Sequence, residues 1–230
     1  MSVLNVKKHN NKTIKESDFL IRISEKEYIE STRSGFLYMN PLSFFRKIEQ
    51  KGVGDEEEGI MSTNGLGNII YNGEVIAKIK NIRTFMDCPI FCASSIYLNQ
   101  VEIGHYEYTF PSEMLKEFMP DSTKQYSLLL LQKENFIQRI DKALLKKNLQ
   151  GYTGNVKYTD EIKTFLQEEF YKYAFRKRSI YEYQHEWRLA INMGIDENEH
   201  YILDIGDISD ITRQYPIKNN EQEFKLEVYI

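Results

Sequence analysis

The fold class follows from one stretch of the sequence, Ile69-Ile70-Tyr71-Asn72-Gly73-Glu74-Val75-Ile76-Ala77. Two short apolar runs flank the dipeptide Asn72-Gly73, whose residues accept the positive φ angles of a type I′ turn. A two-residue turn of this type joins antiparallel strands, so the stretch predicts a β-hairpin between residues 68 and 80. We therefore expect antiparallel β-structure in this chain.

Strands and helices follow one another irregularly on both sides of this hairpin. Hydrophobic patterning predicts strands over 19–23, 36–40, 89–97, 126–132, 156–158, 186–193, 201–205 and 224–230. It predicts helices over 42–50, 113–119, 134–148 and 162–174, and another that a Ser-x-x-Glu capping signature opens at Ser24 and Gly35 ends. Without regular βαβ alternation, the pattern favours an α+β fold with a curved, mostly antiparallel sheet flanked by helices. We expect one domain over 18–230 and a loosely ordered arm over 1–17.

Composition excludes several classes of protein. The 230 residues are 41% hydrophobic and 28% charged, as in globular domains, and 30 basic against 34 acidic residues give no general attraction to nucleic acid. The N-terminus lacks an apolar signal segment, and no apolar run is long enough to cross a bilayer. Cys88 and Cys92 have no second pair and the histidines are scattered, so we expect free thiols, no metal site and a cytoplasmic location.

Three blocks resemble a family of uncharacterised bacterial proteins, DUF2971. They are Phe36-Leu37-Tyr38-Met39-Asn40-Pro41-Leu42-Ser43-Phe44-Phe45, then Asn155-Val156-Lys157-Tyr158, and then the run from Phe175 to Leu189 that ends in Gln184-His185-Glu186-Trp187-Arg188-Leu189. The resemblance extends over about residues 19–210, and its last block is the most specific. The family name implies no chemistry, so a function has to come from the residues themselves.

A second resemblance does imply chemistry. The order Arg22, Ser94-Ser95 and Gln184-x-Glu186 is similar to the Arg … Ser-x-Ser … Gln/Glu-x-Glu pattern of NAD-dependent ADP-ribosyltransferases. This resemblance implies that Glu186 stabilises the cationic sugar formed when the bond to nicotinamide breaks. It implies that Arg22 holds the diphosphate of NAD, that Ser94 or Ser95 braces the site, and that Gln184 faces the acceptor. The hypothesis requires Arg22, Ser95 and Glu186 to converge on one cleft.

Other interpretations of these residues stay open. Arg22 can pair structurally with a carboxylate, and Glu186 can form a same-face pair with Arg188. The pocket can also serve a module that senses nucleotides, or binds a protein, without turnover. The acidic loop Asp55–Glu58 can hold a divalent cation for a nuclease.

The densest basic and aromatic stretch is a further candidate. Arg176, Lys177 and Arg178 lie among four tyrosines, an arrangement that suits a phosphate or a stacked base. The predicted partners are therefore a small nucleotide and a protein or nucleic-acid target, without a membrane. The acceptor and the oligomeric state are not defined by the sequence, and a role in bacterial or phage conflict is one hypothesis for the pathway.

Overall fold

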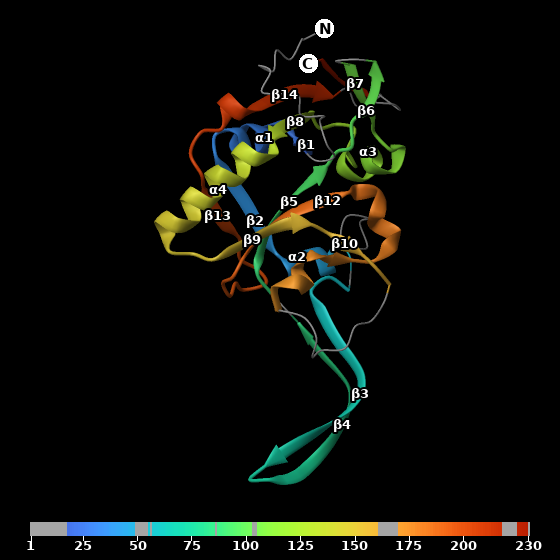
Figure 1. The fold of residues 1–230 in the computed structure, drawn as a ribbon, viewed down its shortest axis with the longest axis vertical. Helices are drawn as coiled ribbons and strands as arrows, with labels where there is room; N and C mark the ends of the chain where they lie inside the picture. The colour runs from blue at the N-terminus through green and yellow to red at the C-terminus, as the bar shows by residue number, and fades with distance from the viewer. Residues whose placement is uncertain are drawn as a thin grey trace.

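In the computed structural model, helices and strands are mixed along the chain, which confirms the α+β class (Figure 1). The main sheet contains eight of the described strands. The structure describes residues 18–48, 55, 57–85, 87–102, 105–160, 170–217 and 225–229. Six strands follow the order β13-β2-β5-β1-β8-β14, and β12 pairs with both β5 and β9. All these pairings are antiparallel. Their bounds are β1 (Phe19–Glu25), β2 (Phe36–Pro41), β5 (Pro89–Ser95), β8 (Tyr126–Gln132), β9 (Gly151–Asn155), β12 (Glu186–Ile191), β13 (Tyr201–Asp204) and β14 (Thr212–Ile217).

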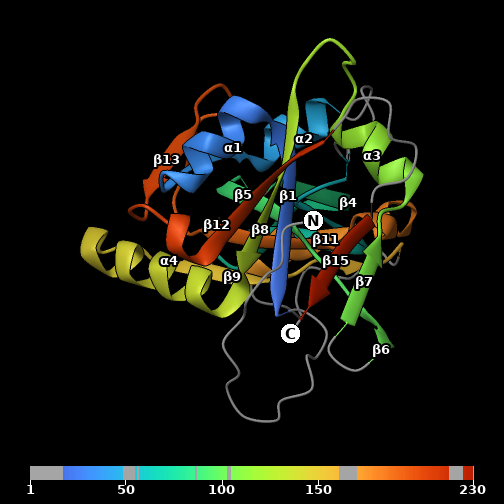
Figure 2. The same cartoon turned by 90° about the horizontal axis from the view of Figure 1, so that it is seen from above.

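The central strand β8 explains how the sheet is covered on both sides. Its residues alternate between the faces: Leu129 and Leu131 join one core cluster, and Leu128 and Leu130 join another. Helices α1 (Lys26–Arg33) and α4 (Lys133–Lys147) cover the first face, and α3 (Ser112–Phe118) lies on the second (Figure 2). A strand buried on both faces reads as a continuous apolar run, which is why the sequence signal at 126–132 was unambiguous.

The predicted hairpin is present as a long arm. It consists of β3 (Ile60–Tyr71) and β4 (Glu74–Phe85), and its turn residues Asn72 and Gly73 have φ angles of 48° and 83°. Figure 1 shows that the arm extends away from the main sheet. Side chains at its tip, including Ile70 and Tyr71, are exposed to solvent. The turn prediction is confirmed, and the hairpin extends over 60–85, about twice the predicted range of 68–80.

Smaller elements complete the described residues. One sheet contains β6 (Asn99–Glu102), β7 (His105–Thr109) and β15 (Lys225–Tyr229), and β10 (Lys157–Tyr158) pairs in parallel with β11 (Arg176–Lys177). Helix α2 (Leu42–Lys47) and the 3₁₀ helices η2 (Phe170–Phe175), η3 (Ser179–Gln184) and η4 (Ser209–Ile211) connect the strands. Among the helices that are described, none combines the length and apolar character needed to cross a membrane.

Several local predictions were wrong or lie elsewhere. Ser24 belongs to β1, and α1 begins at Lys26 without a side-chain cap, because the Lys26 amide donates to the Gln125 carbonyl at 2.8 Å. The sequence did not predict strands β6, β7, β9, β11 and β14. Residues 170–175 form a 3₁₀ helix in place of the α-helical spacing that we predicted. The predicted arm over 1–17 and the start of the predicted helix, 162–169, lie outside the described residues.

Candidate functional site

A pocket, which we call the inner pocket, lies where β1 and β5 of the main sheet diverge. β1 and β5 pair at Leu20–Ser95 and Ile21–Ser94, and their described residues beyond that point are not in register. The pocket has a volume of about 170 Å³. Its polar lining consists of Arg22, Cys92, Ser94, Glu117, Lys177, Gln184 and Glu186. Four residues predicted from sequence, Arg22, Ser94, Gln184 and Glu186, therefore line one cavity.

Glu186 is the acid of a buried ion-pair network. Arg188 donates from Nε to Oε1 of Glu186 at 2.8 Å and from Nη2 to Oε2 at 2.9 Å. Lys177 Nζ lies 3.3 Å from the Glu186 carboxylate and 3.4 Å from that of Glu58, which also pairs with Arg188. Burial raises the pKa of Glu186, but Arg188 and Lys177 outweigh it and hold the pKa well below its usual value. Two acids and two bases thus neutralise each other inside the protein.

This network changes the role expected of Glu186. The same-face pair with Arg188, one of the interpretations of the sequence, is present. A carboxylate already paired with two cations offers a developing positive charge less net stabilisation than a free one. Glu186 nevertheless lines the pocket, so its catalytic role stays a prediction.

Gln184 reaches the pocket by a different route from the one we predicted. We expected Gln184 and Glu186 to share the face of one strand. Gln184 instead ends η3, His185 adopts a left-handed conformation with a φ of 43°, and β12 begins at Glu186. The left-handed conformation of His185 bends the chain sharply between η3 and β12, and both Gln184 and Glu186 still line the cavity.

Arg22 is a cation without an acidic partner in the described part of the chain. Its Nη1 donates to the Cys92 carbonyl at 2.6 Å, and its guanidinium lies over the Phe91 ring, 4.5 Å from the centroid. Its Nε is buried and finds no hydrogen-bond partner within the described ranges. Burial lowers the pKa of Arg22, and no carboxylate opposes that shift. The structural pairing with a carboxylate that the sequence allowed is therefore not present among the described residues.

Glu117 is a pocket residue that the sequence did not reveal. It projects from α3, and its carboxylate accepts hydrogen bonds from Tyr183 Oη at 2.6 Å and from Gln184 Nε2 at 2.5 Å. Burial raises the pKa of Glu117, and these hydrogen bonds oppose the shift without cancelling it. Gln184 in turn accepts from Lys177 Nζ at 2.7 Å, which links Glu117 to the ion-pair network.

Ser95 lies in a neighbouring cavity. That cavity has a volume of about 220 Å³, and Ser95, Tyr158, His185 and Glu186 contribute to its lining. The predicted convergence of Arg22, Ser95 and Glu186 on one cleft is therefore wrong for Ser95, and its neighbour Ser94 lines the pocket with Arg22 and Glu186 instead. Adjacent residues of a strand point to opposite faces, which separates the two hydroxyls.

The basic run makes contacts inside the protein. Lys177 is buried in the ion-pair network, and the Arg178 Nε donates to Asp55 Oδ1 at 2.6 Å. Arg176 lies over the Tyr173 ring, 5.1 Å from its centroid. Lys177 and Arg178 are thus neutralised by carboxylates of the chain, which favours a structural role over the predicted phosphate contact.

The acidic loop makes the other half of these pairs. Asp55 and Glu58 are buried, and their carboxylates bind Arg178, Arg188 and Lys177. A carboxylate committed to a cation of the chain has lost much of its attraction for a divalent metal. The interpretation as a metal-dependent nuclease is therefore disfavoured.

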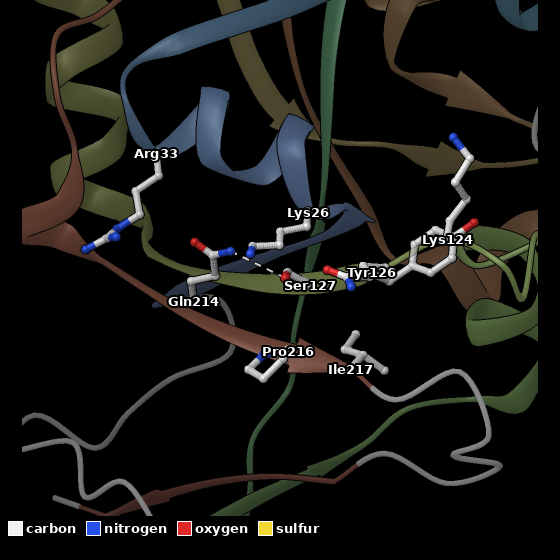
Figure 3. Close-up of a pocket in the computed structure, with 9 residues that line it drawn as sticks. Lys26, Arg33, Lys124, Tyr126, Ser127, Gln214, Pro216 and Ile217 are labelled. Carbon is white, nitrogen blue, oxygen red and sulfur yellow. Dashed lines mark hydrogen bonds between the residues drawn. The ribbon is translucent and has the colours of Figure 1, made fainter.

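A larger, shallower groove, which we call the outer groove, lies between α1 and the strands β8 and β14 (Figure 3). Its volume is about 730 Å³, and Lys26, Arg33 and Lys124 are among its lining residues. Lys26 lies 3.7 Å from Glu30 and Lys124 lies 3.1 Å from Glu25, in pairs that face solvent. Exposed pairs are screened and weak, so the inner pocket, which contains the half-buried Arg22 whose Nε has no partner among the residues described, is the stronger candidate site.

The comparisons with known proteins give no further guide. No family model, no curated protein and no solved structure matches the chain. The site is therefore interpreted from its own residues.

Proposed function

We propose that this protein binds a phosphorylated ligand of the nucleotide class in the inner pocket, with Arg22 as the residue that holds the anion. The observation that carries the proposal is the half-buried side chain of Arg22, whose Nε is buried and has, among the described residues, neither a hydrogen-bond partner nor a carboxylate beside it. A buried charge without a counter-ion costs several kcal/mol, about what is lost when a buried pair is broken. A phosphate supplies the missing charge and suits the planar fork of donors of an arginine.

The size of the pocket limits what it encloses. Pockets that bury a whole drug-sized ligand have volumes of roughly 300–1,000 Å³, and this one has about 170 Å³. It suits a sugar phosphate, with a base or a second nucleotide half extending outside. NAD, the predicted cofactor, meets this description.

A second candidate is ADP-ribosyl transfer from NAD. Ser94, Gln184 and Glu186 support it because they line the same pocket as Arg22, although the required convergence of Ser95 with them is not met. The proposal of binding does not require this step. We also propose that the chain is related to the DUF2971 family. In support, residues of two resembling blocks line this pocket: Phe45 of the first block, and Lys177, Gln184 and Glu186 of the last block. We further propose a cytoplasmic location, which suits the free thiols of Cys88 and Cys92.

Calorimetric titration tests the proposal. Phosphate, AMP, ADP-ribose and NAD are titrated into the wild type, into Arg22→Gln and into Arg139→Gln, whose guanidinium pairs with Asp210 at the surface. We expect the wild type and Arg139→Gln to bind at least one of these ligands, and Arg22→Gln to bind it at least tenfold more weakly. Equal affinity of all three proteins, or no binding to the wild type, would refute the proposal.

Nicotinamide release separates the two candidates. Release by the wild type that Glu186→Gln abolishes supports transfer. Binding of NAD without release leaves the protein as a binding or sensing module.

A further inference from the structure

Two carboxyl groups line the pocket, and they differ in their partners. Glu186 is paired with Arg188 and Lys177. Among the described residues, Glu117 accepts its hydrogen bonds from the neutral donors Tyr183 and Gln184. Glu117 thus has no ion pair within the described part of the chain, and it lies on the wall of the cavity that Arg22 also lines.

The surroundings of Glu117 fix it as an acceptor. The Gln184 Oε1 accepts from Lys177, so the amide Nε2 must face Glu117 and donate to it. Tyr183 Oη donates to the other carboxylate oxygen. A carboxylate can accept about four hydrogen bonds, so acceptor sites remain for a ligand. With two donors already in place, only a further donor complements it.

The charge of Glu117 also determines which part of a ligand can lie beside it. A phosphate placed there would meet a like charge in a partly buried site, where repulsion is strong. The phosphate belongs at Arg22, and a neutral donor belongs at Glu117. In a nucleotide, the neutral donors next to the phosphate are the hydroxyls of the sugar.

We propose that Glu117 accepts hydrogen bonds from the ribose hydroxyls of the ligand whose phosphate Arg22 binds, and that the pocket thereby selects ribonucleotides over nucleotides that lack these hydroxyls. This inference rests on the proposed function and adds the substrate class to it. Glu117 is then a specificity-determining residue, and the α3 helix carries it.

The test compares AMP with 2′,3′-dideoxyadenosine 5′-monophosphate, which lacks both hydroxyls, by calorimetric titration. The wild type should bind AMP about tenfold to a hundredfold more tightly, as expected for one hydrogen bond to a charged acceptor. Glu117→Gln should lose this preference and bind the dideoxy compound with an affinity within about twofold of the wild type. Glu113→Gln, an exposed position on the same helix, should keep the preference.

The outcomes separate the two proposals. Equal binding of the two nucleotides to the wild type, or a preference that persists in Glu117→Gln, overturns the inference about ribose and leaves the anion site intact. Failure of the wild type to bind any phosphate overturns the proposed function itself. The comparison of ligands on the wild type needs no variant, so it decides the inference even if Glu117→Gln does not fold.

Discussion

Arg188→Met is the sharpest perturbation of the buried network, because Arg188 is fully buried and holds two acids at once. The substitution removes two hydrogen bonds to Glu186, one to Glu58 and one, of 2.7 Å, to the Ala174 carbonyl. Lys177 stays within 3.4 Å of both carboxylates and compensates part of the loss. Breaking a buried pair on one side costs about 3–5 kcal/mol, and we expect the free energy of unfolding to fall by about 3 kcal/mol.

Urea unfolding followed by the fluorescence of the single tryptophan, Trp187, measures this loss, because that residue is 1% exposed and lies next to Arg188 in β12. The matched control is Arg139→Met. Arg139 pairs with Asp210 at 2.8 Å, but the two side chains are 35% and 58% exposed, so the control should lose at most about 1 kcal/mol. Equal losses in both variants would refute the reasoning, since Glu186 would then not depend on Arg188 and would be free for another role.

Three further outcomes follow from the same contacts. Arg22→Met should change the free energy of unfolding by no more than about 1 kcal/mol, because removal of an unpaired charge offsets the lost hydrogen bond to the Cys92 carbonyl. If thermal unfolding shows that the free energy of unfolding falls by more than about 3 kcal/mol, Arg22 has a structural role. Arg188 and Lys177 hold the pKa of Glu186 below its ordinary value of 4.5, although burial acts in the opposite direction. The ionised carboxylate therefore stabilises the fold above pH 4.5, and this stabilisation is lost as the pH falls below that value. The urea midpoint should therefore fall below pH 4.5 more steeply in the wild type than in Glu186→Gln, and parallel slopes would contradict the pairing. Cys88 is buried and burial raises its pKa to about 12, so this thiol should react with a disulfide reagent at pH 8 only after unfolding; its rapid reaction in the native protein would oppose its burial.

The sequence was most informative where one local rule determines the structure. Asn72-Gly73 determines its turn by itself, and the run 126–132 determines a strand buried on both faces. It was least informative where tertiary contacts replace a local signal. The first amide of α1 is satisfied by a carbonyl about a hundred residues away, so the capping signature at Ser24 has no function there. Strand β14 contains Pro216 and lies at an edge of the sheet, where the sequence gives a weak pattern.

The candidate site was predictable only in part, for a related reason. Arg22, Ser94 and Glu186 were visible because each is a polar residue in an otherwise apolar strand. The pair of Glu186 with Arg188 was one of the interpretations of the sequence, but the more distant partners were not visible. Glu58 lies 130 residues from Arg188, and Glu117 is one acid on a short amphipathic helix. Only packing brings these groups together, and that packing turned an expected free carboxylate at 186 into a paired one.

The most direct test of the account is a crystal structure of the protein bound to AMP. We predict that the phosphate lies within hydrogen-bond distance of the Arg22 guanidinium in the inner pocket, with the ribose toward Glu117. A phosphate bound in the outer groove, beside Lys26, Arg33 and Lys124, with Arg22 unoccupied, would contradict the account.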